Sequence, residues 1–365
     1  MYSSRTAEVL AVRPQSGACE ELLVRLRDGQ AKALNYLPLT GPAAAGDLVV
    51  LNTTAVELGL GSGGYHFVIL NLSRPERDGS GAGHIMKLRY TPQQVKVLAV
   101  EEEASPYHAV MKEAAGLDGM PVIVAELHSM LAPLALALQE KKPGISLAYV
   151  MTDGGALPAF LSRAVSALKE RGLLAGVVTC GHAFGGDLEA VTVYSGLLAA
   201  KHVLQADAAI VCMGPGVAGT GTPFGFSGLE MGDNLNRAGS LQGRPIALPR
   251  ISFADPRRRH RGLSHHTLRA LVTAALVAVD VPLPVLTGGE ADYLSRQIAD
   301  CGLAQKHRLY RYDKLTLDCL GQDYALCRTM GRTPAADPAF FLAAVATAVH
   351  TAAVLDGSVT ECAAG

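Results

Sequence analysis

The sequence predicts an α/β protein with a mostly parallel sheet and helices on both of its faces, a three-layer, Rossmann-like arrangement preceded by a small all-β barrel-like domain. Three observations predict this fold class. The first hundred residues hold short apolar runs separated by Gly and Pro turns. From about Ser105, strand-length apolar runs alternate with segments whose apolar residues recur at three-and-four spacing. The 365 residues suit two domains, and 49% of them are hydrophobic, which is enough for a buried core.

The N-terminal domain is predicted to span residues 1–103. AEVLAV and ELLVRL flank RPQSGACE, which is the pattern of a hairpin with a Gly turn. Further strand-like runs are GDLVVLNTTA, YHFVILNL, IMKLRY and VKVLAV, and the Gly-rich stretches LGLGSGG and ERDGSGAG separate them. Short strands of this kind are typical of a small barrel or sandwich. The pattern indicates no chemistry, and we interpret the domain as a packing or dimerisation module.

The second domain is predicted to span residues 104–365 and to contain repeated strand–helix units. The expected strands are PVIVAEL, SLAYVM, LAGVVT, DAAIVCM, RPIALPRISF and VPLPVL. The expected helices are MLAPLALALQEK, PAFLSRAVSALKERG, LEAVTVYSGLLAAKHVL and HHTLRALVTAALVAV, and a long Gly-rich loop follows DAAIVCM. Strands that alternate with helices form a parallel sheet covered on both faces.

Polar or Gly-rich segments follow five consecutive predicted strands. In an open parallel sheet, ligands bind at the edge formed by the carboxyl ends of the strands. We therefore expect these segments to meet at one edge. They are Glu126-Leu-His128, Thr152-Asp153-Gly-Gly, the run from Thr179 through His182 and Asp187 to Glu189, GPGVAGTGTPFGFSG over residues 214–228, and Asp255 with the residues after it.

The stretch SFADPRRRHRGLSHHT, residues 252–267, concentrates Arg and His in a chain that is otherwise balanced in charge. Ser264 precedes an apolar-periodic run and is a predicted helix N-cap. His265 and His266 then begin the helix, whose positive end favours neutral imidazole. A neutral histidine can act as a base, donate to a substrate oxygen or bind a metal.

The residues just upstream of this helix are candidate anion ligands. Arg259 and Arg261 carry guanidinium groups, which suit a planar carboxylate or a phosphate, and His260 lies between them. Asp255 is expected to orient one of these groups. The alternative is a solvated basic loop on the surface.

Gly214, Gly216 and Gly219 form a G-x-G-x-x-G pattern after a predicted strand. A dinucleotide site requires a helix at once, whereas Thr220-Gly221 and a further run containing Pro223 intervene, so NAD is not expected. The Gly214–Gly221 backbone can instead cradle a phosphate or carboxylate. A long structural turn is the alternative.

Asp153, His182 and Asp187 are candidate groups for proton transfer, together with His265 and His266. The candidate ligands for a divalent metal are His128, Asp153, His182, Asp187 and His265, and His260 and His266 add further imidazoles. No tight spacing such as H-E-x-x-H supports a metal site, so it would have to assemble from separate loops. A hydrogen-bonded histidine without a metal is the alternative for His128 and His182.

Composition limits the partners. Lys plus Arg number 32 and Asp plus Glu number 33, so no general attraction to nucleic acid or to an anionic membrane is expected. Seven cysteines without a C-x-x-C pair favour free thiols in a reducing compartment. The first residues lack the pattern of a secretory signal, and FFLAAVATAVHTAAVL is shorter than a membrane span and suits a core helix. We expect a soluble cytoplasmic protein and leave a homo-oligomer open.

Several long segments carry a resemblance to a known family. They are GDLVVLNTTAVELGLGSGGYHFVI, GHIMKLRYTPQQ, YVMTDGGALPAF, CGHAFGGDLEAVT, GPGVAGTGTPFGFSG, RISFADPRRRHRGLSHHT and MGRTPAADPAFF. The chain resembles the bacterial family catalogued as domain of unknown function 3866, from the first barrel strands to the last helix. The resemblance implies a bacterial cytosolic protein and no particular reaction.

The residues themselves favour an enzyme, a hydrolase or group transferase, acting on a small phosphorylated or carboxylated molecule, with a divalent metal as an open alternative. The other interpretation is a regulatory protein that binds such a molecule without turnover. An enzyme needs an acid or base within reach of the ligand, whereas a sensor needs only satisfied contacts and a movable element.

Overall fold

The computed structural model describes residues 2–79 and 81–359, including all of their side chains except those of residues 16 and 322–325. The chain divides into two compact units, Met1–Leu98 and Ala99–Gly365. The boundary expected from the sequence, after residue 103, lies close to this division. Each unit has its own hydrophobic core.

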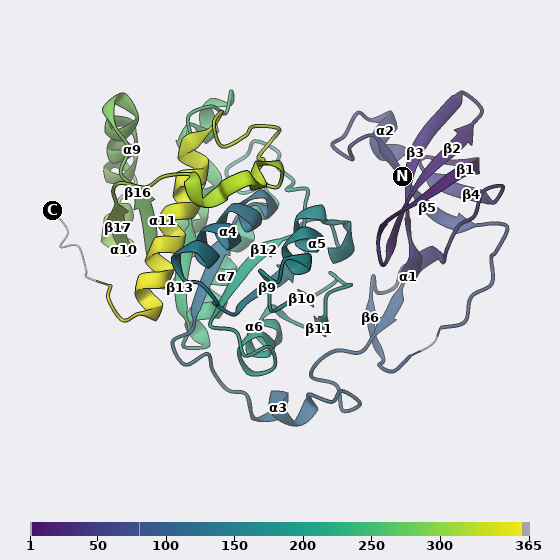
Figure 1. The fold of residues 1–365 in the computed structure, drawn as a ribbon, viewed down its shortest axis with the longest axis horizontal. Helices are drawn as coiled ribbons and strands as arrows, with labels where there is room; N and C mark the ends of the chain where they lie inside the picture. Colours follow the sequence, from purple (N-terminus) through teal and green to yellow (C-terminus); the bar gives the residue numbers. More distant parts are fainter. Residues whose placement is uncertain (1, 80, 360–365) are drawn as a thin grey trace. The chain divides into compact units, whose positions relative to one another are not determined.

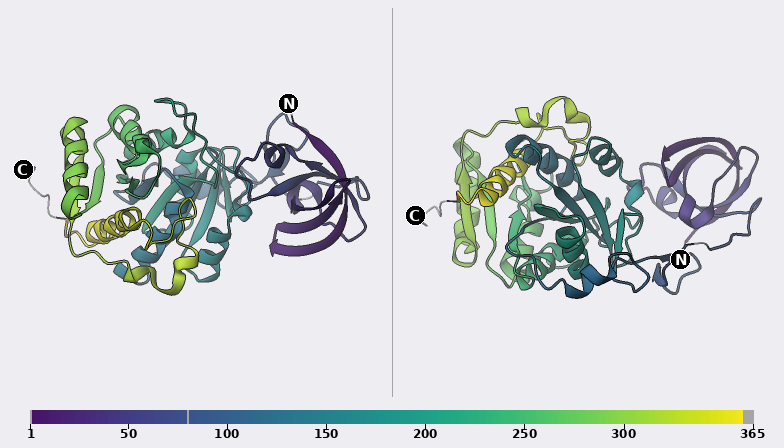
Figure 2. Two further views of the ribbon diagram at one scale, coloured as in Figure 1. Left: turned by 90° about the horizontal axis from the view of Figure 1, so that it is seen from above. Right: turned by 60° about the horizontal axis from the view of Figure 1, so that its bottom comes forward.

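Five strands of the first unit close into a barrel within residues 2–79, in the order β1-β2-β3-β5-β4. They are β1 (Ser4–Ser16), β2 (Cys19–Leu26), β3 (Gly29–Tyr36), β4 (Leu48–Asn52) and β5 (Tyr65–Asn71). Strands β3 and β5 pair in parallel, and the other barrel pairs are antiparallel. This strand order is that of the five-stranded Greek-key barrel of the OB type. The predicted small barrel is therefore confirmed, and the right-hand view of Figure 2 shows its purple strands curving into a ring.

Alternating side chains fill this barrel because successive residues of a strand point to opposite faces. Val9, Leu22, Val24 and Leu51 are fully buried inside it. Short helices α1 (Leu37–Thr40) and α2 (Thr54–Glu57) and the hairpin of β6 (Ile85–Lys87) with β7 (Val95–Val97) complete the described part of this unit.

The second unit is built on one parallel sheet, in which residues 99–359 contribute eight strands in the order β11-β10-β9-β12-β8-β13-β16-β17. The strands are β8 (Pro121–Ala125), β9 (Leu147–Thr152), β10 (Gly176–Cys180), β11 (Leu188–Ala190), β12 (Ala208–Met213), β13 (Arg244–Leu248), β16 (Asp280–Pro284) and β17 (Arg308–Tyr312). All neighbouring pairs are parallel. Strands β8, β9, β10 and β12 are buried along their whole length, as expected of a sheet covered on both faces.

Helices of the second unit cover the sheet from two sides. They are α3 (His108–Glu113), α4 (Leu131–Lys141), α5 (Arg163–Glu170), α6 (Val193–His202), α7 (Glu230–Ser240), α8 (His265–Arg269), α9 (Gly288–Asp300), α10 (Leu303–Lys306) and α11 (Pro338–Leu355). Helix α11 packs on α4, and α6 packs on α7 (Figure 1). The predicted α/β class with a parallel sheet is confirmed.

Three of the predicted helices begin or end elsewhere. The helix expected over residues 158–172 is α5, which begins at Arg163 after the N-cap Ser162 and ends at Glu170. The helix expected from Leu188 begins at Val193, because Leu188–Ala190 pair with β10 as the edge strand β11. The long helix expected after Ser264 is short: α8 ends at Arg269, and a π-helical turn, Ala270–Ala274, follows it. Asn236 ends this turn, since its side chain donates to the carbonyl of Ala274 and accepts from the N–H of Leu276.

The connections that leave β8 and β12 position the site. The chain runs from β8 through α4 to β9 in one direction across the sheet, and from β12 through α7 to β13 in the other. Because such crossovers are right-handed, α4 and α7 lie on opposite faces. The carboxyl ends of the neighbouring strands β8 and β12 therefore flank a topological switch point, where ligands bind in sheets of this kind.

Helix α11 is the one helix of the described residues that is long and apolar enough, by composition, to cross a membrane, and 67% of it is buried inside the protein. It packs on α4 and on strands β13 and β16. A core helix of this kind passes the same test of length and hydropathy.

Candidate metal centre

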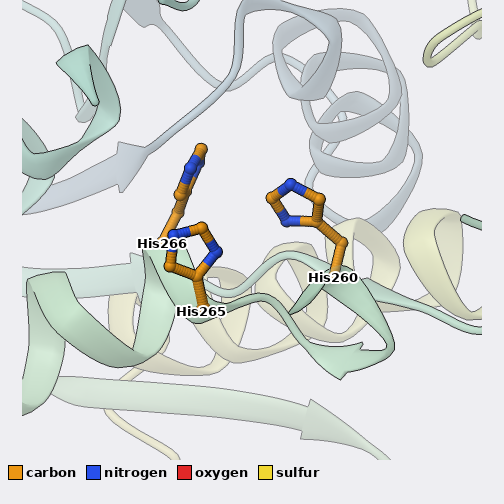
Figure 3. Close-up of side chains that lie close together, drawn as sticks. All are labelled: His260, His265 and His266. Atoms are coloured by element: carbon orange, nitrogen blue, oxygen red, sulfur yellow. The ribbon is translucent and has the colours of Figure 1, made fainter. Parts of the chain in front are cut away.

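Three histidines from neighbouring segments converge near the carboxyl end of the sheet. His260 ends a 3₁₀ turn, Arg258–His260, and His265 and His266 are the first two residues of α8. One ring nitrogen from each of the three lies within 4.8 Å of the others, the one group of this kind found among the described residues. Figure 3 shows the three rings around a shared space. His260 and His266 are buried, and His265 is half-buried.

A small hairpin brings these histidines together. Strand β14 (Ile251–Ser252) pairs antiparallel with β15 (Gly262–Leu263), so the chain folds back on itself and returns His260 to the start of α8. Gly262 has a φ of 69°, and a Cβ there would lie 2.1 Å from Oε1 of Gln297, so the position requires glycine.

Ser264 joins the two halves of the cluster. Its hydroxyl oxygen accepts from the N–H of His266 at 3.2 Å, which confirms the predicted N-cap. The same oxygen lies 2.9 Å from Nδ1 of His260. Nε2 of His260 is therefore the nitrogen left for another ligand.

The other two rings also direct nitrogens to the shared space. Nδ1 of His266 lies 3.7 Å from Oε1 of Glu126, the first residue after β8, and leaves Nε2 available. Both ring nitrogens of His265 are shielded from solvent and make no hydrogen bond of good geometry to the described residues. Metal-binding histidines use one nitrogen for the metal and commonly donate from the other to a carboxylate or hydroxyl. His260 with Ser264 follows this pattern, whereas Nδ1 of His266 faces Glu126 at a distance too long for a hydrogen bond.

A buried network of charges supports the cluster. Glu126 is fully buried and accepts from the hydroxyl of Thr267 at 2.6 Å, and Nη1 of Arg250 lies 3.5 Å from its other oxygen. Arg250 is also buried and donates through Nη2 to Asp255 at 3.0 Å. Three more charged side chains extend the network outward: Arg257, Arg332 and Asp337. Burial raises the pKa of Glu126, and the guanidinium of Arg250 and the hydrogen bond from Thr267 oppose this shift. Each buried carboxyl group of this network thus has a cationic partner.

The histidines of the cluster are held in the neutral form. Burial, then the positive charge of Arg250, lowers the pKa of His260 to about 3, and burial together with the neighbouring imidazoles lowers the pKa of His266 to about 3. Burial, followed by the guanidinium of Arg259, also lowers the pKa of His265, although the main chain of Arg259 opposes this shift. Neutral imidazoles were predicted from the helix dipole, whereas burial is the main cause in the structure. Neutral imidazole is the form that binds a metal.

The Gly-rich loop after β12 lies against the histidines. The ring of Phe226 stacks on His266 with centroids 3.9 Å apart and an interplanar angle of 3°. A Cβ on Gly219 would lie 3.8 Å from Nε2 of His266, and a Cβ on Gly221 would lie 3.9 Å from Nη1 of Arg259.

The rest of this loop is held by its own main chain. The backbone N–H and the hydroxyl of Thr220 both donate to the carbonyl of Gly225, which closes the loop. Gly214 packs against the main chain of Ala156, and Gly216 has a φ of 99° with open space around it. Among the predicted loop glycines, Gly219 and Gly221 therefore lie nearest to the imidazoles and to Arg259.

Other predicted site residues lie apart from the three histidines. His128 bonds to Ser162 at 2.6 Å and to Tyr149 at 3.3 Å, and burial lowers its pKa to about 4. Asp153 accepts from the N–H of His182 at 2.9 Å, as a separate contact between the ends of β9 and β10.

Asp187 was predicted to lie at the carboxyl edge of the sheet, but the structure places it at the opposite, amino-terminal edge. Its side chain accepts from the N–H of Val177, near the start of β10, and pairs with Lys169. The reason is the edge strand β11, which pairs in parallel with β10 from Leu188 onward and so returns Asp187 to the amino ends of the strands.

Arg261 and Asp255 have structural partners. The guanidinium of Arg261 lies over the rings of Phe253 and Tyr293, at 5.5 and 5.8 Å from their centroids. Asp255 receives two bonds from the side chain of Arg257 as well as the one from Arg250. Arg259 is exposed and is the predicted arginine that remains closest to the loop and the histidines.

No role was predicted from the sequence for Glu126, Arg250, Phe226 or Glu230. Glu126 carried a signal, as the first polar residue after an entirely apolar strand. Glu230 begins α7, accepts from the hydroxyl of Thr152, and has its pKa raised to about 7 by burial with a contribution from Asp153. The sequence signal for Glu230 is its position as an acidic residue in the first turn of α7.

A family model described as protein of unknown function, DUF3866, matches residues 32–348. The chain belongs to this family. The match covers nearly the whole chain and confirms the resemblance. The DUF3866 region contains all three histidines of the cluster together with Glu126 and Arg250. No curated protein and no solved structure is significantly similar to the chain.

Proposed function

We propose that this protein is a metal-dependent enzyme that hydrolyses, or transfers a group from, a small anionic substrate at the carboxyl edge of its parallel sheet. His260, His265 and His266 would hold the metal. The observation that carries the proposal is the convergence of three neutral, largely buried imidazoles whose ligand atoms lie within 4.8 Å of one another. The substrate would carry a phosphate or a carboxylate.

The donor set fits a catalytic divalent ion. Three protein ligands with a further open position are typical of catalytic zinc sites, whereas structural zinc sites use four protein ligands. An ion bound in this way can polarise a substrate oxygen and acidify a bound water. Because these imidazoles are already neutral, metal binding does not require them to release a proton.

Arg259 and the Gly219–Gly221 backbone support an anionic substrate. The guanidinium of Arg259 is exposed, lies beside Gly221 and acts on the pKa of both His265 and His266, so it is close to the centre. Guanidinium groups bind carboxylate and phosphate through two parallel hydrogen bonds. The small residues of the loop let a ligand approach the backbone.

The test is turnover by protein freed of metal with a chelator and reloaded with Zn²⁺ or Mn²⁺. The probes are p-nitrophenyl phosphate, bis-p-nitrophenyl phosphate and p-nitrophenyl acetate. We expect turnover of at least one probe that needs the metal and falls by about 100-fold or more in His265→Ala. Arg259→Gln should raise the KM for the charged probes, and Arg258→Gln, a neighbouring exposed arginine, is its matched control.

Equal rates for the reloaded, metal-free and His265→Ala proteins would contradict the proposal. A second candidate function, binding and regulation without turnover, is favoured by Phe226, whose ring covers one face of His266. Metal and phosphate that bind together, with no hydrolysis of any probe, would support that candidate instead.

A further inference from the structure

A second charged cluster lies at the opposite, amino-terminal edge of the same sheet. It is made by the first residues of three neighbouring parallel strands: Arg244 of β13, Asp280 of β16 and Arg308 of β17. Asp280 pairs in register with Arg308. This cluster is distinct from the three histidines, which lie near the carboxyl ends of the strands.

Asp280 is fully buried and saturated with partners. Nε of Arg244 donates to its Oδ2 at 2.7 Å, and Nε of Arg308 donates to its Oδ1 at 2.6 Å. On the protein side, Nε2 of His350 lies 3.0 Å from Oδ2, and the hydroxyl of Tyr312 lies 2.8 Å from Nδ1 of His350. These contacts keep the carboxylate charged and fix its orientation.

The two arginines use their Nε atoms to hold Asp280, so the outer ends of both guanidinium groups remain available. Among the described residues, these outer nitrogens make one long hydrogen bond, in which Nη2 of Arg308 donates to the carbonyl of Ala278 at 3.5 Å. The side chains of Arg244 and Arg308 are 32% and 39% exposed. One carboxylate needs one cation, so two guanidinium groups leave an excess positive charge at this surface.

The exposed ends of these arginines open on a groove with a volume of about 590 Å³. Its other walls include Tyr310, Pro245, Val277 and Ala278, which are largely apolar. The groove is therefore larger than an inorganic anion needs, and it combines a cationic end with an apolar wall.

We propose that this groove binds a small organic oxyanion, a carboxylate or phosphate group carried on an apolar body. Arg244 and Arg308 bind the oxyanion, and Asp280 is a positioning residue that holds both guanidinium groups toward the groove. Two guanidinium groups fixed by a shared carboxylate bind such an anion with little loss of side-chain freedom. The site is independent of the metal centre and of the function proposed for it.

The experiment is calorimetric titration of the full-length protein with phenyl phosphate, benzoate, inorganic phosphate and benzyl alcohol. We expect phenyl phosphate or benzoate to bind at least 10-fold more tightly than benzyl alcohol, which lacks the charge, and more tightly than inorganic phosphate, which lacks the apolar body. The stronger of the two aromatic probes shows whether the ligand is a phosphate or a carboxylate.

Variants assign the binding to the groove. Arg308→Gln should weaken it at least 10-fold, and Arg296→Gln, an exposed arginine of α9, is the matched control. Because Arg308→Gln leaves Asp280 with less charge compensation, Ala278→Phe is the second variant: it fills the groove and leaves the ion pairs in place. Arg259→Gln separates this binding from binding at the metal centre.

The proposal predicts that binding persists in Arg259→Gln and is lost in Ala278→Phe. Absence of binding by both aromatic anions at millimolar concentration would overturn it. Equal binding by the wild type, Arg308→Gln and Ala278→Phe would overturn it as well, and would leave Arg244 and Arg308 as neutralising partners of Asp280 only.

Discussion

Oε1 of Glu126 lies 3.7 Å from Nδ1 of His266; the side chain of Glu126 is fully buried, and that of His266 is 7% exposed. Glu126 follows the buried strand β8, whereas His266 is the second residue of α8, more than a hundred residues later, so the contact depends on the tertiary fold. The distance is too long for a hydrogen bond, but a carboxylate beside Nδ1 favours an N–H at this nitrogen and leaves Nε2 for another ligand. At hydrogen-bond distance, this pair would be the carboxylate–histidine arrangement that commonly orients a metal-binding histidine.

Glu126→Gln tests this support. The amide keeps the size of the side chain but removes the negative charge beside Nδ1, so we expect the affinity for Zn²⁺ to fall roughly 10- to 100-fold while the metal still binds. Competition with a chromophoric chelator at pH 7.5 measures the change. Glu230→Gln, which neutralises a half-buried carboxyl bonded to Thr152, is the matched control. An unchanged affinity for Zn²⁺ in Glu126→Gln would show that Glu126 does not support metal binding by His266.

The buried histidines should make the metal-free protein sensitive to acid. The pKa of His260 falls from about 6.5 in the unfolded chain to about 3 in the fold. Between these values the unfolded chain binds more protons, so the free energy of unfolding decreases as the pH falls, by about 1.4 kcal/mol per pH unit for each such group.

His260→Gln removes one of these groups, and we expect its free energy of unfolding to depend less steeply on pH than that of the wild type between pH 6.5 and 5. Urea unfolding of the metal-free proteins at several pH values measures both slopes. The comparison uses the difference between the two proteins because Glu230, whose pKa is raised to about 7, acts with the opposite sign in this range. His202→Gln, in α6, is the matched control. Parallel slopes for His260→Gln and the wild type would show that His260 is not held neutral.

Gly219 gives access to His266. Its Cβ position is only in ordinary van der Waals contact with Phe226 and His266, so alanine fits there without a clash. We therefore expect Gly219→Ala to bind metal and Gly219→Leu, whose larger side chain extends toward Nε2 of His266, to lose it. Metal titration followed by thermal unfolding measures both effects. Full metal binding by a well-folded Gly219→Leu protein would show that the metal reaches the histidines by another route.

Arg250 and Arg257 both bond to Asp255 but differ in exposure. Arg250 is buried and is also the partner of Glu126, whereas the side chain of Arg257 is 40% exposed. Arg250→Met leaves the buried Glu126 without its cation and removes one of the cationic partners of Asp255, so it should lower the free energy of unfolding by about 3–5 kcal/mol. Arg257→Gln should cost less than about 1 kcal/mol. Similar losses in urea unfolding experiments would contradict the charge network described here.

Local patterns were sufficient for much of the fold. Strands β8, β9, β10, β12, β13 and β16 are apolar runs of strand length, and the alternation with helical segments predicts their parallel sheet. The edge strand β11 was not foreseen, because its three residues precede a helix and share its apolar pattern. The helix after Ser264 was expected to be long, because the contact from Asn236 that ends it comes from a distant part of the chain.

The site was predicted only in part, for a similar reason. The density of His and Arg between residues 257 and 266 pointed to the segment, and Ser264 was read correctly as an N-cap. Spacing alone could not show that His260 meets His265 and His266, since this depends on the β14–β15 hairpin. Asp187 was misplaced because the chain returns to the amino end of β10 before it enters the parallel edge strand β11. Arg250 was overlooked since nothing in its local sequence shows that Glu126 is its partner.

The most direct test of the account is the metal content of the purified protein, measured by elemental mass spectrometry before any chelator is added and compared with that of His265→Ala. His265 is the most informative position, because its ring nitrogens are shielded from solvent and have no good hydrogen-bond partner among the described residues. The account predicts close to one equivalent of a transition metal in the wild type and its loss in a folded His265→Ala variant. A wild-type protein that contains no metal and binds none when Zn²⁺, Mn²⁺ or Fe²⁺ is supplied would contradict it.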